Sequence, residues 1–172
     1  MNNTCLLIHI VFSTKNRERT IALQQREPLF KYIKGIITNI KCFPLAINGM
    51  GDHIHIFFDL RPSLSVADFV KTVKQSTNNW MKETGNYPDF MGWQEGYFAG
   101  SVSPDGKNRC INYIINQGVH HVGKSFLAEM EWLKLKYEIE TELMKRKEER
   151  IKGATPMGLG EEGENPASIP EG

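Results

Sequence analysis

The chain has 172 residues, which suffices for one domain with a single substantial core and leaves little room for a second. All 21 lysines and arginines but only 16 of the 20 acids lie in residues 1–152, so that part is mildly basic, as nucleic-acid-binding proteins often are. The three cysteines are isolated and lack CxxC spacing, which argues against a disulfide framework or a structural zinc site and favours a reducing cytoplasm. They are Cys5, Cys42 and Cys110.

The first 60 residues predict two strands that frame a helix, followed by a third strand. Residues 5–12 are a continuous apolar run, too short to cross a bilayer, and predict a buried strand before a polar loop at 13–19. Apolar residues then recur at helical spacing from Leu29 to Ile40, which predicts an amphipathic helix with Pro28 in its first turn. Residues 43–47 and 53–60 predict a hairpin, because the two glycines of segment 48–52 permit a tight reversal.

The rest of the chain predicts one more strand and three helices. Ser65 and Asp68 form a capping-box pattern that opens a helix, and 85–96 is a loop rich in turn residues. A strand is expected at 97–102, a helix at 107–119 and a last helix at about 125–152. Residues 153–172 are acidic and rich in Gly and Pro, so a disordered tail is expected after a single domain at 1–152.

The element order β-α-β-β-α-β predicts an α+β fold of the ferredoxin-like, split βαβ type. Such a fold has an antiparallel sheet with helices on one face. The C-terminal helices, including the one at 107–119, are added to this arrangement.

A His-x-His pattern on the predicted second hairpin strand is the first candidate site. Side chains alternate along a strand, so His53 and His55 lie on one face while Ile54 lies on the other. Two imidazoles on one face can hold a metal ion, and Asp52 could accept a hydrogen bond that orients one of them. Two ordinary strand histidines are the alternative for such a short pattern.

A tyrosine and a glutamine four residues apart form the second candidate. In a helix, Tyr113 and Gln117 share a face, and a wheel places them opposite a predicted core stripe that contains Ile111, Ile114, Ile115 and Gly118. A phenol is almost wholly protonated near neutral pH, so as a nucleophile it needs a polarised phosphate, a base, or both. A metal beside an activatable hydroxyl indicates phosphoryl transfer.

The ordered motifs resemble those of the single-tyrosine HUH transposases, bacterial insertion-sequence enzymes and their REP-associated relatives. The resemblance rests on Val-Phe-Ser-Thr-Lys-Asn-Arg near the start, Gly-Asp-His-Ile-His, Trp-Gln-Glu-Gly-Tyr, and Tyr-Ile-Ile-Asn-Gln-Gly-Val-His-His. It implies that Tyr113 is the nucleophile and that His53, His55 and Gln117 bind one divalent cation, Mg²⁺ or Mn²⁺. It further implies cleavage and rejoining of single-stranded DNA through a 5′-phosphotyrosine intermediate.

The same resemblance implies partners and a location. The expected substrate is single-stranded DNA with hairpin ends, and the expected assembly is a homodimer with no membrane association. A bacterial cytoplasmic location is expected, associated with the nucleoid when DNA is bound. Basic residues in the loop and on the second helix are predicted to contact phosphates, and they are Lys15, Arg17, Arg19, Lys71 and Lys74.

Two other functions remain open from the sequence. One is a nucleic-acid-binding module that keeps the fold without the reaction, which the intact set of His53, His55, Tyr113 and Gln117 disfavours. The other is a small relaxase-like nickase, which the small size and the single candidate tyrosine disfavour.

Overall fold

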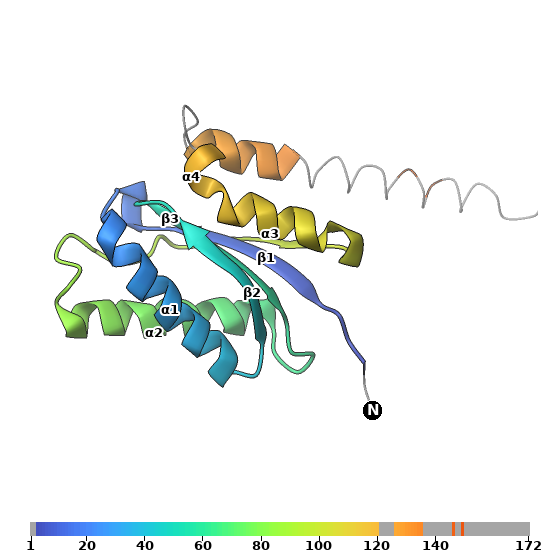
Figure 1. The fold of residues 1–172 in the computed structure, drawn as a ribbon, viewed down its shortest axis with the longest axis horizontal. Coiled ribbons are helices and arrows are strands. Elements are labelled where there is room, and N and C mark those ends of the chain that lie inside the picture. The colour runs from blue at the N-terminus through green and yellow to red at the C-terminus, as the bar shows by residue number, and fades with distance from the viewer. Residues whose placement is uncertain (1–2, 121–125, 136–145, 147–148, 150–172) are drawn as a thin grey trace, which may run out of the picture. The chain divides into compact units, whose positions relative to one another are not determined.

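The computed structural model describes residues 3–120, 126–135, 146 and 149 (Figure 1). The chain divides into two compact units, residues 1–130 and residues 131–172. In the second unit, residues 131–135, 146 and 149 are helical, and the predicted tail at 153–172 lies outside the described residues. The first unit contains β1 Leu7–Ser13, α1 Leu23–Asn39, β2 Phe43–Gly49, β3 His53–Asp59, α2 Val66–Thr84, β4 Phe98–Ser101, α3 Lys107–Ile115 and α4 Gln117–His120.

The four strands form one antiparallel sheet in the order β2-β3-β1-β4. This confirms the α+β, ferredoxin-like fold, in which the first and third strands lie at the centre. Figure 1 shows α1 and α2 on one face of the sheet and α3 on the other. The tyrosine-bearing helix therefore covers the face that the split βαβ unit leaves open.

Side-chain alternation in the central strands separates the main core from the second face. In β3, Ile54, Ile56 and Phe58 are fully buried in the core cluster that includes the apolar sides of α1 and α2. His53, His55 and Phe57 are buried on the opposite face, where Phe57 packs with Ile114 of α3. Because both faces of β3 are covered, the strand is apolar throughout apart from its two histidines and its terminal aspartate.

Several elements begin or end where the sequence predicts. The Ser65 hydroxyl accepts a hydrogen bond from the Asp68 N–H at 3.0 Å, so the predicted cap starts α2, and Gly85 ends it in a left-handed conformation. The three cysteines are free, as expected. Within the described residues, no helix is both long and apolar enough to cross a membrane.

The prediction for the start of the first helix was wrong. Helix α1 begins at Leu23, so Pro28 lies inside the helix and not in its first turn. The Gln25 side chain accepts a hydrogen bond from the Ala22 N–H at 2.6 Å and thereby caps the earlier start. The apolar periodicity missed this turn because Leu23 is exposed and the residues after it are polar.

The helix predicted at 107–119 is also interrupted. Helix α3 ends at Ile115, Asn116 adopts a non-helical cap conformation, and α4 starts at Gln117. Asn48 of β2 explains the position of the break, because its side-chain amide donates to the carbonyls of Ile114 and Ile115 at 2.9 Å each. The last carbonyls of a helix lack the regular i+4 N–H partner, and here the strand supplies a side-chain donor for them.

The β2–β3 hairpin is tight, as predicted, but its glycines serve a different purpose from the one expected. Neither Gly49 nor Gly51 has a positive φ. A Cβ atom on Gly49 would lie 2.3 Å from the His53 carbonyl oxygen and 2.9 Å from the Ile54 Cα. Gly49 therefore permits a close backbone approach beside His53 and supplies no unusual dihedral angle.

We expect Gly49→Ala to destabilise the domain by about 2 kcal/mol, because the added methyl group meets backbone atoms that can move only with the strand. Gly35→Ala is the matched control, since a Cβ at this exposed α1 position meets nothing within 4 Å. The control should gain about 0.5 to 1 kcal/mol from helix propensity. Urea unfolding of both variants measures the two changes. Equal stability of the two variants would contradict the close approach.

Candidate metal and nucleophile site

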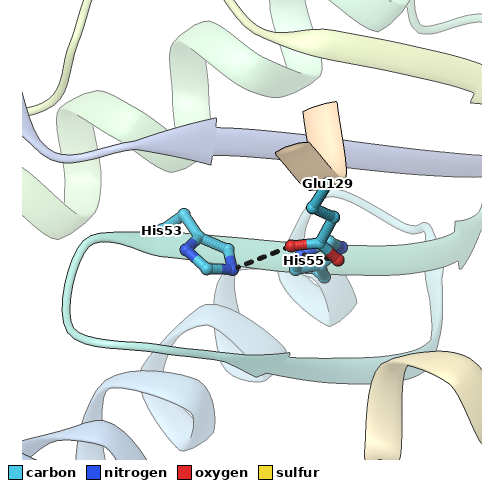
Figure 2. A group of neighbouring side chains, drawn as sticks. All are labelled: His53, His55 and Glu129. Carbon is cyan, nitrogen blue, oxygen red and sulfur yellow. Dashed lines mark ion pairs between the residues drawn. The ribbon is translucent and has the colours of Figure 1, made fainter. Parts of the chain in front are cut away.

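Two histidines of β3 and one glutamate form a buried cluster on the α3 face of the sheet (Figure 2). His53 and His55 are 1% and 0% exposed, and Glu129 is 8% exposed. The His53 Nε2 lies 3.5 Å from Glu129 Oε2, and the His55 Nε2 lies 3.5 Å from Glu129 Oε1. The strand therefore presents both imidazoles to one carboxylate, as the predicted shared face requires.

The spacing of these donor atoms is compatible with one cation shared by the three residues. One donor atom from each of the three residues lies within 4.8 Å of the others. Two donors that each bind a cation at about 2.1 Å can lie no more than about 4.2 Å apart, and the two histidine–glutamate separations of 3.5 Å meet this limit. Imidazole nitrogen and carboxylate oxygen are common donors to divalent metals. The three residues thus form a candidate metal site.

The other ring nitrogen of each histidine is held by a neighbour. His53 Nδ1 lies 2.7 Å from the Asp52 carboxylate, which is the contact predicted from the sequence. His55 Nδ1 lies 3.0 Å from His9 Nε2 of β1. When Nε2 binds a cation, Nδ1 carries the proton and donates to this neighbour, so both contacts fix the tautomer that a ligand needs.

Neither His9 nor Glu129 was predicted from the sequence. His9 lies within the apolar run of β1. Its contact with His55 depends on the pairing of β1 with β3, in which Val11 lies opposite His55. Glu129 belongs to the helical residues 126–135, a segment with several charged side chains and no distinctive spacing. The sequence signal for both is weak, because each depends on contacts between distant segments.

Tyr113 and Gln117 reach the same carboxylate from α3 and α4. The Tyr113 hydroxyl and the Gln117 side-chain amide both donate to Glu129 Oε1, the latter at 3.1 Å. Gln117 is fully buried and Tyr113 is half-buried against the small cluster around Phe57 and Ile114. The structure thus brings the predicted nucleophile and the predicted ligands together.

The predicted core stripe of this helix was half right, because Ile111 and Ile114 pack in the small cluster around Phe57 but the other two residues do not. Ile115 is 59% exposed and Gly118 is exposed, whereas Ile114 and Gln117 are fully buried. The wheel assumed one continuous helix, but the break at Asn116 changes the direction in which Gln117 and Gly118 point. It also assumed that the Tyr113 side chain points away from the core, whereas this side chain packs on the sheet face that carries Phe57.

Burial and hydrogen bonds shift two pKa values in opposite directions. Burial first, and then the contact with Glu129, raises the pKa of the Tyr113 phenol. Burial alone would raise the pKa of the Glu129 carboxyl, but the contacts with His55, Tyr113 and Gln117 outweigh it and hold that pKa far below its usual value. The site therefore contains a protonated phenol next to an ionised carboxylate.

The predicted basic loop lies beside the histidines. Ser13 pairs with His53, and the Thr14 N–H donates to the Asp52 carbonyl at 2.9 Å. The guanidinium carbon of Arg17 lies 5.8 Å from the centre of the Phe126 ring, which stacks on His53 with centroids 4.4 Å apart. The three predicted basic residues of this loop are all exposed, and they are Lys15, Arg17 and Arg19.

The two predicted lysines of α2 have different surroundings. Lys71 is exposed, whereas the Lys74 ammonium donates to the carbonyls of Gln94 and Gly96 at 2.8 and 2.5 Å. Lys74 therefore holds the loop before β4, and burial lowers its pKa. Helix α2 covers the sheet face opposite the histidines, and the DNA contact of these two lysines stays a prediction.

Comparisons with known proteins bear on the family and the fold of the chain. A family model described as "Transposase IS200 like" matches residues 3–117. A candidate transposase from Deinococcus radiodurans R1 is 22% identical, with a TM-score of 0.54, over 67% of this chain and 93% of that one. A REP-associated tyrosine transposase, solved bound to a REP hairpin, is 12% identical, with a TM-score of 0.53, over 71% and 73% of the two chains. No curated protein is significantly similar to the chain.

The two structural matches establish a shared fold at these identities. The family match is broader evidence, because it covers most of the chain and includes the positions of His53, His55, Tyr113 and Gln117. It stops before Glu129, so the carboxylate that joins these residues lies beyond the matched segment.

Proposed function

The chain belongs to the IS200-like transposases, and we propose that it cleaves and rejoins single-stranded DNA through a covalent link to Tyr113. One observation carries this proposal: the Tyr113 hydroxyl contacts the same carboxylate that faces His53 and His55. A nucleophile and a candidate cation site within one buried cluster are what phosphoryl transfer to a side chain requires.

In the proposed reaction, Tyr113 Oη forms a bond to the scissile phosphorus and the bond to the 3′ oxygen breaks. The DNA stays attached as a 5′-phosphotyrosine, and the proton lost by the phenol balances the proton taken up by the leaving 3′ hydroxyl. A 3′ hydroxyl of a second strand reverses the step, so rejoining needs no external energy source. A divalent cation, Mg²⁺ or Mn²⁺, held by His53 and His55 would polarise the phosphate.

The residues of the chain have separate tasks in this scheme. Asp52 and His9 orient the two imidazoles, and the amide of Asn48 fixes the end of the helix that bears Tyr113. Two side chains compete for the third position on the cation. The family resemblance predicts Gln117, whereas the geometry also offers Glu129.

The proposed substrate is a single strand with hairpin ends, and the proposed assembly is a homodimer. One structural relative was solved bound to a REP hairpin, which supports a structured DNA substrate for this chain. The dimer rests on resemblance alone, and light scattering after size-exclusion chromatography would measure it. A cytoplasmic, nucleoid-associated location likewise stays a prediction.

We expect cleavage of a hairpin-bearing single strand and little cleavage of the same sequence as a blunt duplex. His53 and His55 lie beneath the segments that carry Tyr113, Gln117 and Glu129, so the partner strand of a duplex would meet these segments before its phosphate reached Tyr113. Cleavage of both forms at matched concentration, resolved on denaturing gels, is the test. Equal cleavage would contradict the proposal and indicate a general nuclease.

The basic loop should determine how DNA affinity depends on salt. Three phosphate contacts to single-stranded DNA give a slope of about −2 in log affinity against log salt concentration. Neutralising Lys15, Arg17 and Arg19 together to Gln should therefore make this slope shallower by about 2. Lys34→Gln is the matched control, because this exposed lysine lies on α1, on the sheet face opposite the histidines. A triple variant with the original slope would assign DNA binding to another surface.

A further inference from the structure

We propose that Arg19 and Arg26 together bind one backbone phosphate of the DNA at the tip of the β2–β3 hairpin. This inference rests on the proposed function, because it specifies where a phosphate other than the scissile one is held. Arg26 was not predicted to contact DNA, since in the sequence it stands apart from the basic residues of the loop.

The two arginines meet at the tip of the hairpin, although the loop and α1 carry them separately. The Arg26 Nη1 lies 3.9 Å from the Met50 Sδ. A Cβ atom on Gly51 would lie 3.2 Å from the Arg19 Cβ, so Arg19 packs against the next residue of the same turn. The Ile21 N–H donates to the Gly51 carbonyl at 3.0 Å and holds the loop in this position. The hairpin tip therefore brings two positive side chains to one place.

The charges at this place are not balanced by an acid. Burial first, and then the positive charge of Arg19, lowers the pKa of the Arg26 guanidinium, and the Asp52 carboxylate offsets this only in part. That carboxylate lies 2.7 Å from His53 Nδ1 and is engaged there. In the part of the chain that the structure describes, no ion pair includes either arginine. Two neighbouring positive charges of this kind attract an anion.

Two hydrogen-bond donors beside this pair are unsatisfied. Among the described residues, neither Arg26 Nε nor the hydroxyl of Thr20, which follows Arg19, has a hydrogen-bond partner, and both atoms are buried. An unsatisfied buried donor is unfavourable, and a phosphate oxygen can accept from it. Arg26 as a whole is only half-buried, so part of its guanidinium stays accessible to a ligand. A planar guanidinium that offers parallel N–H groups is well suited to a phosphate.

The position of the pair favours a phosphate of the substrate strand. Gly51 precedes Asp52, and Asp52 contacts His53, so the arginine pair is joined to the candidate cation site by consecutive residues. A phosphate held at the hairpin tip would therefore belong to a nucleotide near the scissile one. Contacts to such phosphates fix the register of a strand and so the position of its reacting phosphate.

The test measures binding of a hairpin-bearing single strand to the full-length protein in chelator, by fluorescence anisotropy. Neutral methylphosphonate linkages replace the phosphates of the strand one at a time. We expect one linkage to weaken wild-type binding by about tenfold and to leave binding by the Arg19→Gln, Arg26→Gln double variant unchanged. The double variant should also have a slope of log affinity against log salt that is shallower by about 0.7, as expected for one phosphate contact.

Two further variants separate phosphate binding from a structural role. Arg26→Lys keeps the charge and should keep most of the salt slope. Lys34→Gln is the matched control, because it removes one charge from an exposed position on the same helix. It should keep both the wild-type slope and the wild-type response to every linkage, and thermal midpoints check that all the variants fold.

Two outcomes would overturn the inference. One is a double variant that keeps the wild-type salt slope and responds to every linkage as the wild type does. The other is a Lys34→Gln variant that loses its response to the same linkage. Because the assay needs no cleavage, its failure differs from failure of the proposed function. If the wild type binds the strand at the expected linkage but forms no adduct at Tyr113, the reaction is refuted and the phosphate site stands.

Discussion

Tyr113→Phe should abolish the covalent adduct between the protein and single-stranded DNA. The substitution removes only the phenolic oxygen, so the ring can keep its packing against the cluster around Ile114 and the variant should fold. Loss of a nucleophile typically lowers the rate by at least about 10³-fold, since no other group can form the covalent intermediate. Denaturing gels with end-labelled DNA would reveal the adduct as a band of reduced mobility.

Tyr97→Phe is the matched control for this experiment. It deletes the same oxygen from a tyrosine that is 44% exposed and precedes β4. The control should form adduct at the wild-type rate. If Tyr113→Phe still forms adduct, the nucleophile has been assigned to the wrong residue. If the wild type binds the strand and forms no adduct, the chain is a binding module that keeps the fold without the reaction.

The sheet and its histidines could be predicted because their signals are local. The alternation in β3 places His53 and His55 on one face irrespective of the rest of the fold, and Asp52 is adjacent in sequence. The capping pattern at Ser65 and Asp68 likewise depends on three consecutive peptide units. Local backbone geometry determines these features, so the structure reproduces them.

The remaining parts of the site depend on tertiary contacts that no periodicity encodes. The break between Tyr113 and Gln117 follows from Asn48, a strand residue far away in the sequence, which donates to the last carbonyls of α3. Glu129 is one of several acids in its segment and is distinguished only by its distance from the histidines. The helical wheel for this segment failed in part for the same reason. It assumed one regular helix, whereas the contact with the sheet interrupts the helix at Asn116.

His55→Ala should lower Mn²⁺ affinity by on the order of 100-fold or more and reduce strand cleavage with it. The imidazole is one of two nitrogen donors to the proposed cation, and loss even of a supporting residue typically costs 10 to 100-fold. His9→Ala is the graded comparison, because His9 contacts His55 Nδ1 but does not belong to the three-residue cluster. It should cost about tenfold.

Both histidines are buried, so folding must be separated from binding in this comparison. The free energy of unfolding in chelator measures the packing loss of each variant without the cation. Calorimetry with Mn²⁺ then measures binding by the folded protein, and cleavage of the hairpin-bearing strand is followed across the same Mn²⁺ concentrations. A folded His55→Ala variant that cleaves DNA at the wild-type rate in chelator would refute metal-dependent chemistry at this site. If the variant regains cleavage at high Mn²⁺, the remaining histidine of β3, His53, retains part of the cation site.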